Sequence, residues 1–462
     1  MMTGKSRTLI VASLAWLISG VADAQQGPVE TKTGQQAAPT TKPNMTYPPK
    51  LPGGRPMITS TSAEFLRAPT TIRDDVVVAK IPPRVDFLYY PNQTYQGNPW
   101  SNWGDSLAVN GKYYASIGDH LAPGGNAFVY EYDPTNQRFR QLVDLRKLLN
   151  LPDGHYTPGK IHSRIDLGED GWLYTSTHRG STRVTNDRYH FKGDWLIRIH
   201  PETGEVNVLS HGPVPKHCLP AGVLDPKRLI YYGGTTPGEE DKNDGVRFFA
   251  YDTKSRKVLC DLPNGPSRSM ILATSSGRVY YTPGTGDSPL MRYTPGIGNV
   301  PEQIEGKISI RAATQETPQG LVYTVSFDHD GREATLYAFN TKTEKVKILG
   351  PAAVGREQYI ATLDADPTGR YIYYMPGAHG GSESDGAPVV QFDTQTNIKK
   401  IIAFLHPFTK NNYGCTLKGT YSAAVTPEGD KLFVTWNVSR DGRVWDACAL
   451  TVIHIPESER RP

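Results

Sequence analysis

The stretch Ile271-Leu-Ala-Thr-Ser-Ser-Gly-Arg-Val-Tyr-Tyr281 decides the fold, because its pattern recurs along the chain. An apolar strand leads into a turn that contains Gly, and a Tyr-rich strand follows, which is typical of a β-hairpin. Six further stretches share this pattern with a Gly, Asp or Pro turn: Ser106–Ala115, Ile165–Tyr174, Ala221–Tyr232, Ala312–Tyr323, Ile360–Tyr373 and Ala423–Val434. The sequence therefore contains seven related hairpins.

Each of these hairpins is followed by a second pair of short strands. The turns of the second pairs usually follow the pattern aromatic-Asp/Asn-x-x-Thr, and they begin at Asp133, Pro201, Asp252, Thr294, Asn340, Asp393 and Pro456. Two hairpins make a four-stranded antiparallel sheet, and seven such sheets arranged radially form a β-propeller. We predict an all-β, seven-bladed propeller. A pair of β-sandwiches is a weaker alternative, as is a β-helix, which needs a much shorter repeat.

The two ends of the repeat array predict how the ring closes. The last unit ends at Thr451–Ile455 with no room for a fourth strand, while the strand-like Val85–Tyr90 precedes the first unit. We expect this N-terminal strand to pair with the last blade and tie the ends together. Helix is expected only in the amphipathic stretch Arg140–Leu149 and at Ser62–Leu66.

Composition agrees with short strands and tight turns. The 462 residues include Gly 45, Pro 37 and Tyr 25, and Gly and Pro interrupt helices. This excludes a coiled coil or a helical bundle. Lys+Arg 50 against Asp+Glu 46 gives a net charge of +4, and so balanced a charge gives no indication of a nucleic-acid partner.

The N-terminus has the three parts of a secretory signal peptide in residues 1–24. Lys5 and Arg7 form a basic start, Leu9–Ile18 is apolar, and Ala22-Asp-Ala24 is a cleavage site. Residues 25–59 are rich in Pro and Thr, which predicts a flexible linker, and residues 60–462 form the predicted propeller domain. No later segment is apolar for long enough to span a membrane. We expect a monomer that is secreted or periplasmic.

The four cysteines suit an oxidising compartment. We expect the disulfides Cys218–Cys260 and Cys415–Cys448, because each pair falls within one repeat unit. Buried free thiols are the alternative. No CxxC or CxxCH motif occurs in the sequence, which argues against haem attachment and against a zinc knuckle.

Functional side chains of a propeller are expected where the chain enters the first strand of a unit or leaves the second, because these positions surround one mouth of the central channel. Reading them in order gives a polar, mostly cationic rim with two phenols: His120, His162, His178, Arg179, His217, Arg268, Arg311, Tyr359, His379 and Tyr421.

The second unit has an unusual composition. Seven of the 12 His fall within residues 155–217. Lys160-Ile-His-Ser-Arg164 leads into its inner strand, and Ser176-Thr-His-Arg-Gly180 leaves the next strand, so His162 and His178 are expected to meet at the rim. The insertion Ser181–Gly193 follows and contains Tyr189. Loops of this length in a compact repeat are often functional.

Three interpretations of these histidines remain open. In the first, His162 and His178 are acid and base, because the pKa of imidazole lies near neutrality, and Tyr189 supplies a phenol. The residues expected to hold an anionic substrate are Arg164, Arg179, His217, Arg268, Arg311, Tyr359 and Tyr421. In the second, His162 and His178 bind a metal with His190 or His217, although no HxH or HExxH spacing occurs. In the third, the histidines are structural.

Two weaker signals concern cofactors and sugars. The turns Asp328–Gly331 and Ser439–Gly442 offer oxygen ligands for calcium, but ordinary strand turns explain them better. Neither calcium nor zinc is supported by a specific motif, and the cofactor stays unknown. Trp100 and Trp103 are candidates for stacking on sugar rings or for packing the entry to the first unit.

The repeat pattern over residues 85–455 and the His-bearing second unit resemble the seven-bladed propeller polysaccharide lyases that cleave ulvan-type and rhamnose–glucuronate linkages. The resemblance implies two catalytic His at the ends of one inner hairpin, which here correspond to His162 and His178, with a Tyr and an Arg from a following blade. The third unit offers His217 and Thr235 at those places, so the phenol must come from Tyr189, Tyr359 or Tyr421. The implied activity is β-elimination on an acidic polysaccharide. The alternative is a propeller that binds carbohydrate or protein without catalysis.

Overall fold

The computed structural model describes residues 45–284, 288–326, 333–441 and 445–460. The described residues belong to one compact unit, Pro43–Pro462. The predicted signal peptide and residues 25–44 of the predicted linker lie outside the described residues, as do the turn Asp328–Gly331 and residues 442–444.

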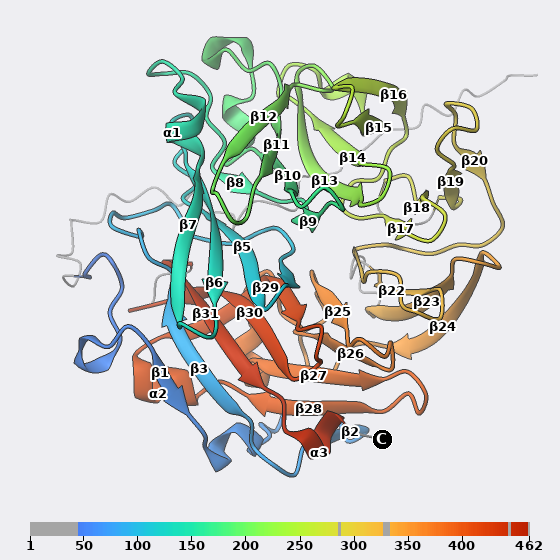
Figure 1. Cartoon of the computed structure of the whole chain (residues 1–462). Coiled ribbons are helices and arrows are strands. Elements are labelled where there is room, and N and C mark those ends of the chain that lie inside the picture. The colour runs from blue at the N-terminus through green and yellow to red at the C-terminus, as the bar shows by residue number, and fades with distance from the viewer. Residues whose placement is uncertain (1–44, 285–287, 327–332, 442–444, 461–462) are drawn as a thin grey trace, which may run out of the picture. The chain divides into compact units, whose positions relative to one another are not determined.

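Seven sheets surround a common centre within the unit Pro43–Pro462 (Figure 1), which confirms the predicted seven-bladed propeller. We number the blades along the chain and give their strands from the centre outward. Blade 1 has β4 (Leu107–Val109), β5 (Lys112–Gly118), β6 (Ala127–Asp133) and β7 (Arg138–Asp144). Blade 2 has β8 (Lys160–Ile161) and β9 (Asp166–Leu167), then β10 (Leu173–His178), β11 (Trp195–Ile199) and β12 (Val206–His211).

The next three blades repeat the four-stranded meander. Blade 3 has β13 (His217–Asp225), β14 (Ile230–Pro237), β15 (Arg247–Asp252) and β16 (Lys257–Pro263). Blade 4 has β17 (Ile271–Ala273), β18 (Arg278–Tyr281), β19 (Met291–Tyr293) and β20 (Glu302–Gln303). Blade 5 has β21 (Ala312–Ala313), β22 (Leu321–Val325), β23 (Thr335–Asn340) and β24 (Lys345–Pro351).

The last two blades recruit strands from the N-terminal part of the chain. Blade 6 has β25 (Leu363–Ala365), β26 (Tyr371–Tyr374), β27 (Pro388–Asp393) and β28 (Lys399–Phe404), with β2 (Val76–Val78) parallel to β28. Blade 7 has β29 (Thr416–Val425), β30 (Lys431–Ser439) and β31 (Ala447–His454), followed by β3 (Arg84–Tyr89) and β1 (Ile58–Ser60).

The ring closes as predicted, because β3 supplies the fourth strand of blade 7. It pairs antiparallel with β31 from Arg84↔His454 to Tyr89↔Ala449. The chain before β3 also contacts the propeller: Leu51 is buried in the apolar cluster between blades 6 and 7, and the Tyr47 hydroxyl donates to Asp446 at 2.7 Å. The described part of the predicted linker, residues 45–59, thus packs against the last blades.

Apolar clusters join each blade to the next. The strands alternate their side chains between the two faces of a sheet, and the buried residues of neighbouring blades form one shared cluster at every one of the seven interfaces between blades. Packing of this kind holds the ring together through the hydrophobic effect.

Helices are short. They are α1 (Leu145–Leu149), α2 (Phe408–Tyr413), α3 (Glu457–Arg460) and the 3₁₀ turns η1 (Pro52–Gly54), η2 (Ala63–Leu66), η3 (Thr182–Val184), η4 (Asp187–Tyr189), η5 (Lys242–Asp244) and η6 (Ser382–Asp385). The expectation of helix over Arg140–Leu149 is wrong for its first half, because the chain up to Asp144 completes blade 1 as β7 and bonds to β6. Asp144 then caps α1 by accepting a hydrogen bond from Lys147 N.

The predicted disulfides are absent, since all four cysteines are buried free thiols. The reason is the order of strands within a blade. Cys218 lies on the innermost strand of blade 3 and Cys260 on the outermost, which places them about three strand spacings, or about 14 Å, apart. Cys415 precedes the innermost strand of blade 7 and Cys448 lies on the third. A disulfide requires Cα atoms within about 7 Å.

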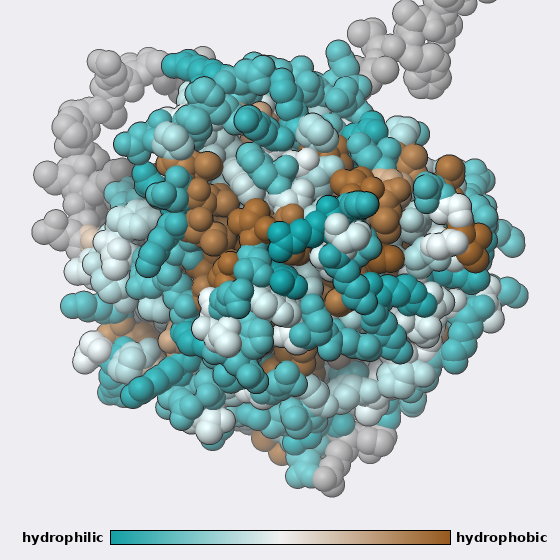
Figure 2. Space-filling view, turned by 45° about the horizontal axis from the view of Figure 1, so that its top comes forward, coloured by the Kyte–Doolittle hydropathy of each residue, from teal (hydrophilic) through white to brown (hydrophobic). Residues whose placement is uncertain are grey.

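One face of the described part of the chain is mostly polar. Figure 2 shows one face on which hydrophilic residues predominate and hydrophobic residues form separate patches between them. Among the described residues, no helix is both long enough and apolar enough to cross a membrane.

Four buried free thiols predict how the protein reacts with a thiol reagent before and after unfolding. Without reductant, the native protein should react slowly with an aromatic disulfide reagent, because all four thiols are buried. The same reagent should titrate four thiols once the protein is unfolded in denaturant. A count of zero in denaturant without reductant would instead mean two disulfides.

The closure predicts that Phe87→Ala on β3 strongly destabilises the protein. Phe87 is fully buried in the cluster between blades 6 and 7, and truncating a buried Phe costs about 3–5 kcal/mol. The measurement is the free energy of unfolding in denaturant. Val77→Ala on the exposed face of β2 is the control and should change this free energy by less than about 0.5 kcal/mol. Equal effects of the two substitutions would contradict the closure.

Candidate active site

A break in the inner strand of blade 2 positions His162. β8 and β9 both pair with β10, but Ile161 lies opposite Thr177 and Asp166 opposite Tyr174, so the inner strand holds two extra residues between these pairs. Ser163 replaces the missing ladder bonds: its hydroxyl accepts a hydrogen bond from Ser176 N at 2.9 Å and donates to Ser176 O at 3.1 Å. Bulges of this kind redirect side chains, and this one presents His162 to the channel.

A second irregularity positions Tyr421 in the inner strand of blade 7. The register of β29 and β30 shifts between Thr420 and Ser422, which leaves Tyr421 as the extra residue. Asn102 fills the gap: it accepts a hydrogen bond from Tyr421 N at 3.4 Å and donates to Thr435 O at 2.6 Å. The following residue, Trp103, packs on Tyr421 with ring centroids 4.7 Å apart.

These side chains belong to one aromatic and cationic group at a mouth of the channel. The Trp103 ring lies 6.3 Å from the ring of His162 and 6.1 Å from that of His379, and Lys160 Nζ lies 4.5 Å from its centroid. Arg311 Nε donates to the Tyr359 hydroxyl at 2.5 Å, and its guanidinium carbon lies 5.5 Å from the centroid of Tyr421. The cations and phenols of four blades therefore meet around Trp103.

The two predicted histidines lie together, but in different environments. Their ring centroids are 5.4 Å apart. His162 lines a cavity at the mouth and is 7% exposed, whereas His178 is fully buried behind it. Nδ1 of His178 faces Oδ2 of Asp194 at 4.0 Å. Only His162 is thus placed to reach a substrate directly.

The hydrogen bonding of His162 defines its tautomer when it is neutral. Nδ1 lies 2.8 Å from Pro220 O, and a carbonyl oxygen can only accept, so Nδ1 carries the proton and Nε2 keeps a lone pair. Burial lowers the pKa of His162 well below its usual value, and the charges of Arg268, Lys160 and Arg311 lower it further. His162 is therefore a neutral imidazole at neutral pH, which is the form that accepts a proton.

The cavity at this mouth is small. Its volume is about 20 Å³, which is room for about one water molecule. Its lining is largely polar and charged: Trp103, Asp105, His162, Ser163, Arg164, Gly222, Val223, Arg268, Ser269, Met270, Arg311, Ala361 and Tyr421. A saccharide must therefore approach this group from the mouth.

The opposite end of the channel is wider and more acidic. A cavity of about 340 Å³ there is surrounded by the turns that follow the inner strands, with Asp364, Asp366 and Glu316 in its wall. Arg164 and Asp105 line both cavities and so separate them. Burial raises the pKa of Asp105 and that of Asp364 to about 6, although the charge of Arg164 opposes both shifts.

The remaining predicted site residues lie elsewhere. The Arg179 guanidinium is buried between blades 2 and 3 and donates to Pro237 O at 3.2 Å. His217 Nδ1 lies 2.8 Å from the Thr235 hydroxyl. Tyr189 packs against the cluster between blades 1 and 2, and its backbone oxygen accepts a hydrogen bond from Tyr156 N at 2.8 Å. Arg268, Arg311, Tyr359 and Tyr421 do gather at the channel mouth, whereas Arg164 lies deeper, between the two cavities.

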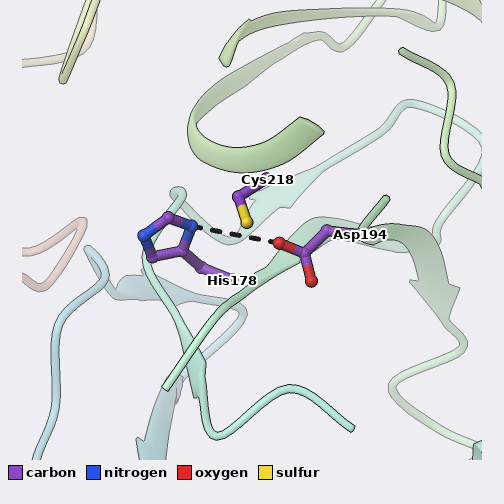
Figure 3. A group of neighbouring side chains, drawn as sticks. All are labelled: His178, Asp194 and Cys218. Carbon is purple, nitrogen blue, oxygen red and sulfur yellow. Dashed lines mark ion pairs between the residues drawn. The ribbon is translucent and has the colours of Figure 1, made fainter. Parts of the chain in front are cut away.

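Sequence reasoning left open whether Trp100 and Trp103 stack on sugar rings or pack the entry to the first unit, and it missed Asp194. Trp103 is 3% exposed and packs at the centre of the group, and Trp100 is fully buried. Asp194, behind His178, follows the insertion Ser181–Gly193, and nothing in its sequence context marks it. Together with Cys218 these two residues form a group whose metal-ligating atoms all lie within 4.8 Å of one another (Figure 3). The metal set expected from sequence is not assembled among the described residues, because His190 stacks on His155 at 4.0 Å and His217 Nδ1 lies 2.8 Å from the Thr235 hydroxyl.

Comparison with known proteins identifies the fold. No protein-family model matches the chain, and no curated protein sequence matches it. An oligogalacturonate lyase in complex with manganese matches with a TM-score of 0.53 at 13% identity, over 88% of this chain and 98% of that one. An oligogalacturonate lyase from Vibrio parahaemolyticus matches with a TM-score of 0.49 at 12% identity, over 87% and 98%. The β-propeller domain of the trilobed protease from Pyrococcus furiosus gives 0.46 at 10% identity, over 77% and 94%. At 13% identity, the likeness to the oligogalacturonate lyase in complex with manganese shows the fold alone.

The raised pKa of Asp364, about 6, predicts a pH effect on stability. The folded protein binds this proton more tightly than the unfolded chain, whose Asp pKa is about 3.9, so the contribution of Asp364 falls as pH rises from about 4 to about 6. The free energy of unfolding of wild type, relative to Asp364→Asn, should therefore fall by about 1–2 kcal/mol between pH 4 and pH 7.

The control substitution, at Asp393, should show the opposite dependence of stability on pH. Burial raises the pKa of Asp393, but hydrogen bonds from Arg370 outweigh it and lower the pKa overall. Wild type relative to Asp393→Asn should therefore gain stability as pH rises from the acid range. The same pH dependence for both substitutions would contradict the burial of Asp364.

Proposed function

We propose that this protein is a lyase that cleaves an acidic, uronate-containing polysaccharide by β-elimination at the mouth that carries His162. The observation that supports it most is the state of His162: a neutral imidazole with its lone pair on Nε2, in a cavity shared with three arginines and a phenol. The fold likeness to an oligogalacturonate lyase and the resemblance noted from the sequence favour the same substrate class.

In the proposed reaction His162 Nε2 removes the proton from C5 of the uronate. Electron density moves to the carboxylate as the C–H bond breaks, so cations beside the carboxylate stabilise the transition state. Arg311 and Arg268 both line the cavity, and guanidinium binds carboxylate in a bidentate manner. They are the groups that we assign to the carboxylate.

The same reaction needs an acid that protonates the leaving oxygen at C4, where the glycosidic bond breaks and the C4=C5 double bond forms. A buried neutral imidazole is a poor donor, so we assign this step to the Tyr421 hydroxyl. Its ring centroid is 6.4 Å from that of His162, and the guanidinium of Arg311 close to its ring favours the phenolate that remains.

His178 is a positioning residue in this proposal. It lies behind His162 with no exposed surface. The sequence assigned the phenol to Tyr189, and we assign it instead to Tyr421, which lines the cavity.

The predicted signal peptide supports a further proposal, that the protein meets its substrate outside the cytoplasm as a secreted or periplasmic protein.

A binding function without catalysis is the second candidate. The observation that favours it is the cavity of about 20 Å³, which has no room for a sugar ring. In that case the cations and Trp103 bind an acidic saccharide at the rim, and His162 serves only as a polar wall.

The test is ultraviolet absorbance from the new conjugated double bond, with full-length mature protein and a panel of uronate polysaccharides. On a substrate that is cleaved, His162→Gln and Tyr421→Phe should each lower kcat by about 10²–10⁴-fold, as expected for loss of a general base or acid. His211→Gln on the outermost strand of the same blade is the matched control and should retain the wild-type rate.

Binding measured in the same series separates the two candidates. For a lyase, His162→Gln should bind the saccharide with nearly wild-type affinity and release no unsaturated product. For a binding protein, no member of the panel gives the ultraviolet signal with wild type. Turnover that survives in His162→Gln would refute the assignment of the base.

A further inference from the structure

We propose that His178, Asp194 and Cys218 form a zinc site behind the mouth of the channel (Figure 3). This site shares only His178 with the three-histidine set suggested by the sequence, and it does not depend on the proposed lyase activity.

The three ligand atoms have nearly the spacing that a metal needs. They lie within 4.8 Å of one another, and Nδ1 of His178 is 4.0 Å from Oδ2 of Asp194. An ion between three atoms so spaced would lie about 2.3–2.8 Å from each, while Zn–N, Zn–O and Zn–S bonds are about 2.0–2.3 Å. A contraction of a few tenths of an ångström completes the coordination.

Hydrogen bonds to Asp194 orient its carboxylate for such a role. Oδ1 accepts from the Tyr156 hydroxyl at 2.9 Å and from the Thr177 hydroxyl at 2.9 Å. Both donors are buried and bind the same oxygen, so the other oxygen, Oδ2, is directed at His178. Partners of this kind, which hold a ligating carboxylate in place, are characteristic of metal sites.

The backbone around the site is held by neighbouring strands. Asp194 N donates to His217 O at 3.0 Å, which fixes Asp194 to the residue before Cys218. Asp194 O accepts from Gly212 N at 2.8 Å. His178 ends β10 of blade 2 and Cys218 lies in β13 of blade 3. The ligands therefore come from two blades, and an ion would join them.

The ligand set selects zinc among the common divalent ions. A sulfur ligand with imidazole and carboxylate suits Zn²⁺, whereas Mg²⁺ and Ca²⁺ take oxygen ligands. Thiolate and carboxylate together carry two negative charges, which offset the ion and the guanidinium of Arg179, whose Nη1 lies 3.9 Å from Cys218 Sγ. The three protein ligands leave the fourth tetrahedral position for a water molecule.

An ion at this place would also hold His178. Ligation through Nδ1 leaves the ring proton on Nε2 and fixes the ring plane. The ring centroid of His178 is 5.4 Å from that of His162, so the ion would also hold in place the ring on which His162 packs.

The test measures metal in the full-length mature protein after expression, and again after refolding, with zinc supplied. We expect about one zinc per wild-type chain. Cys218→Ala should lose the zinc, and Cys260→Ala, which removes the other buried thiol of blade 3, should keep it. Wild type without zinc under both conditions, or Cys218→Ala with as much zinc as wild type, would overturn the site.

Cobalt substitution tests the ligands in wild type itself, so the result does not depend on the folding of a variant. Protein refolded with Co²⁺ should show the visible bands of tetrahedral cobalt and a thiolate-to-cobalt charge-transfer band. Cobalt bound without the thiolate band would place the metal elsewhere and refute the assignment of Cys218.

Discussion

The pairing of β3 with β31 is the contact on which the rest of the propeller depends. Six residue pairs join a strand that precedes blade 1 to the last strand of the chain, and the apolar cluster between blades 7 and 1 lies beside them. Without this pairing, blade 7 has an open edge and the ring is held only by packing. The groups at the channel mouth come from blades 2, 4, 5, 6 and 7, so closure also determines whether they meet.

Irregularity in the inner strands directs two of the side chains at the channel mouth, His162 and Tyr421. A regular strand alternates its side chains between two faces of the sheet. Extra residues at His162 and Tyr421 break this alternation, and the side chains of Ser163 and Asn102 supply the hydrogen bonds that the ladder loses. The two residues are thereby held on rigid elements, which suits a site that must position a reacting group.

The sequence predicts the blades well and the site only in part, for a physical reason. Blades follow from local periodicity, so the seven hairpins and the closing strand were readable from the chain alone. The distance between two residues across a blade does not follow from local periodicity. Cys218 and Cys260 share a repeat unit but lie on its first and last strands, so the expected disulfide does not form. Likewise, residue order brings His162 and His178 together but does not reveal which of them faces the cavity. Asp194 lies beside His178 through packing between blades, which leaves no pattern in the sequence, and the sequence does not decide whether Trp103 packs or faces a sugar.

The charges along the channel connect the fold to its proposed chemistry. Burial lowers the pKa of His162 most, and the nearby charges of Arg268, Lys160 and Arg311 lower it further. The opposite end of the channel is acidic, with Asp364 and Asp366 in its wall. An anionic saccharide is therefore attracted to one end and repelled from the other. A carboxylate that binds these cations also cancels part of their field at His162, because the charges that attract it are those that depress the basicity of the imidazole. In the proposed reaction, substrate binding thus makes His162 a stronger base when the C5 proton is within reach, and the free protein keeps the imidazole neutral until then.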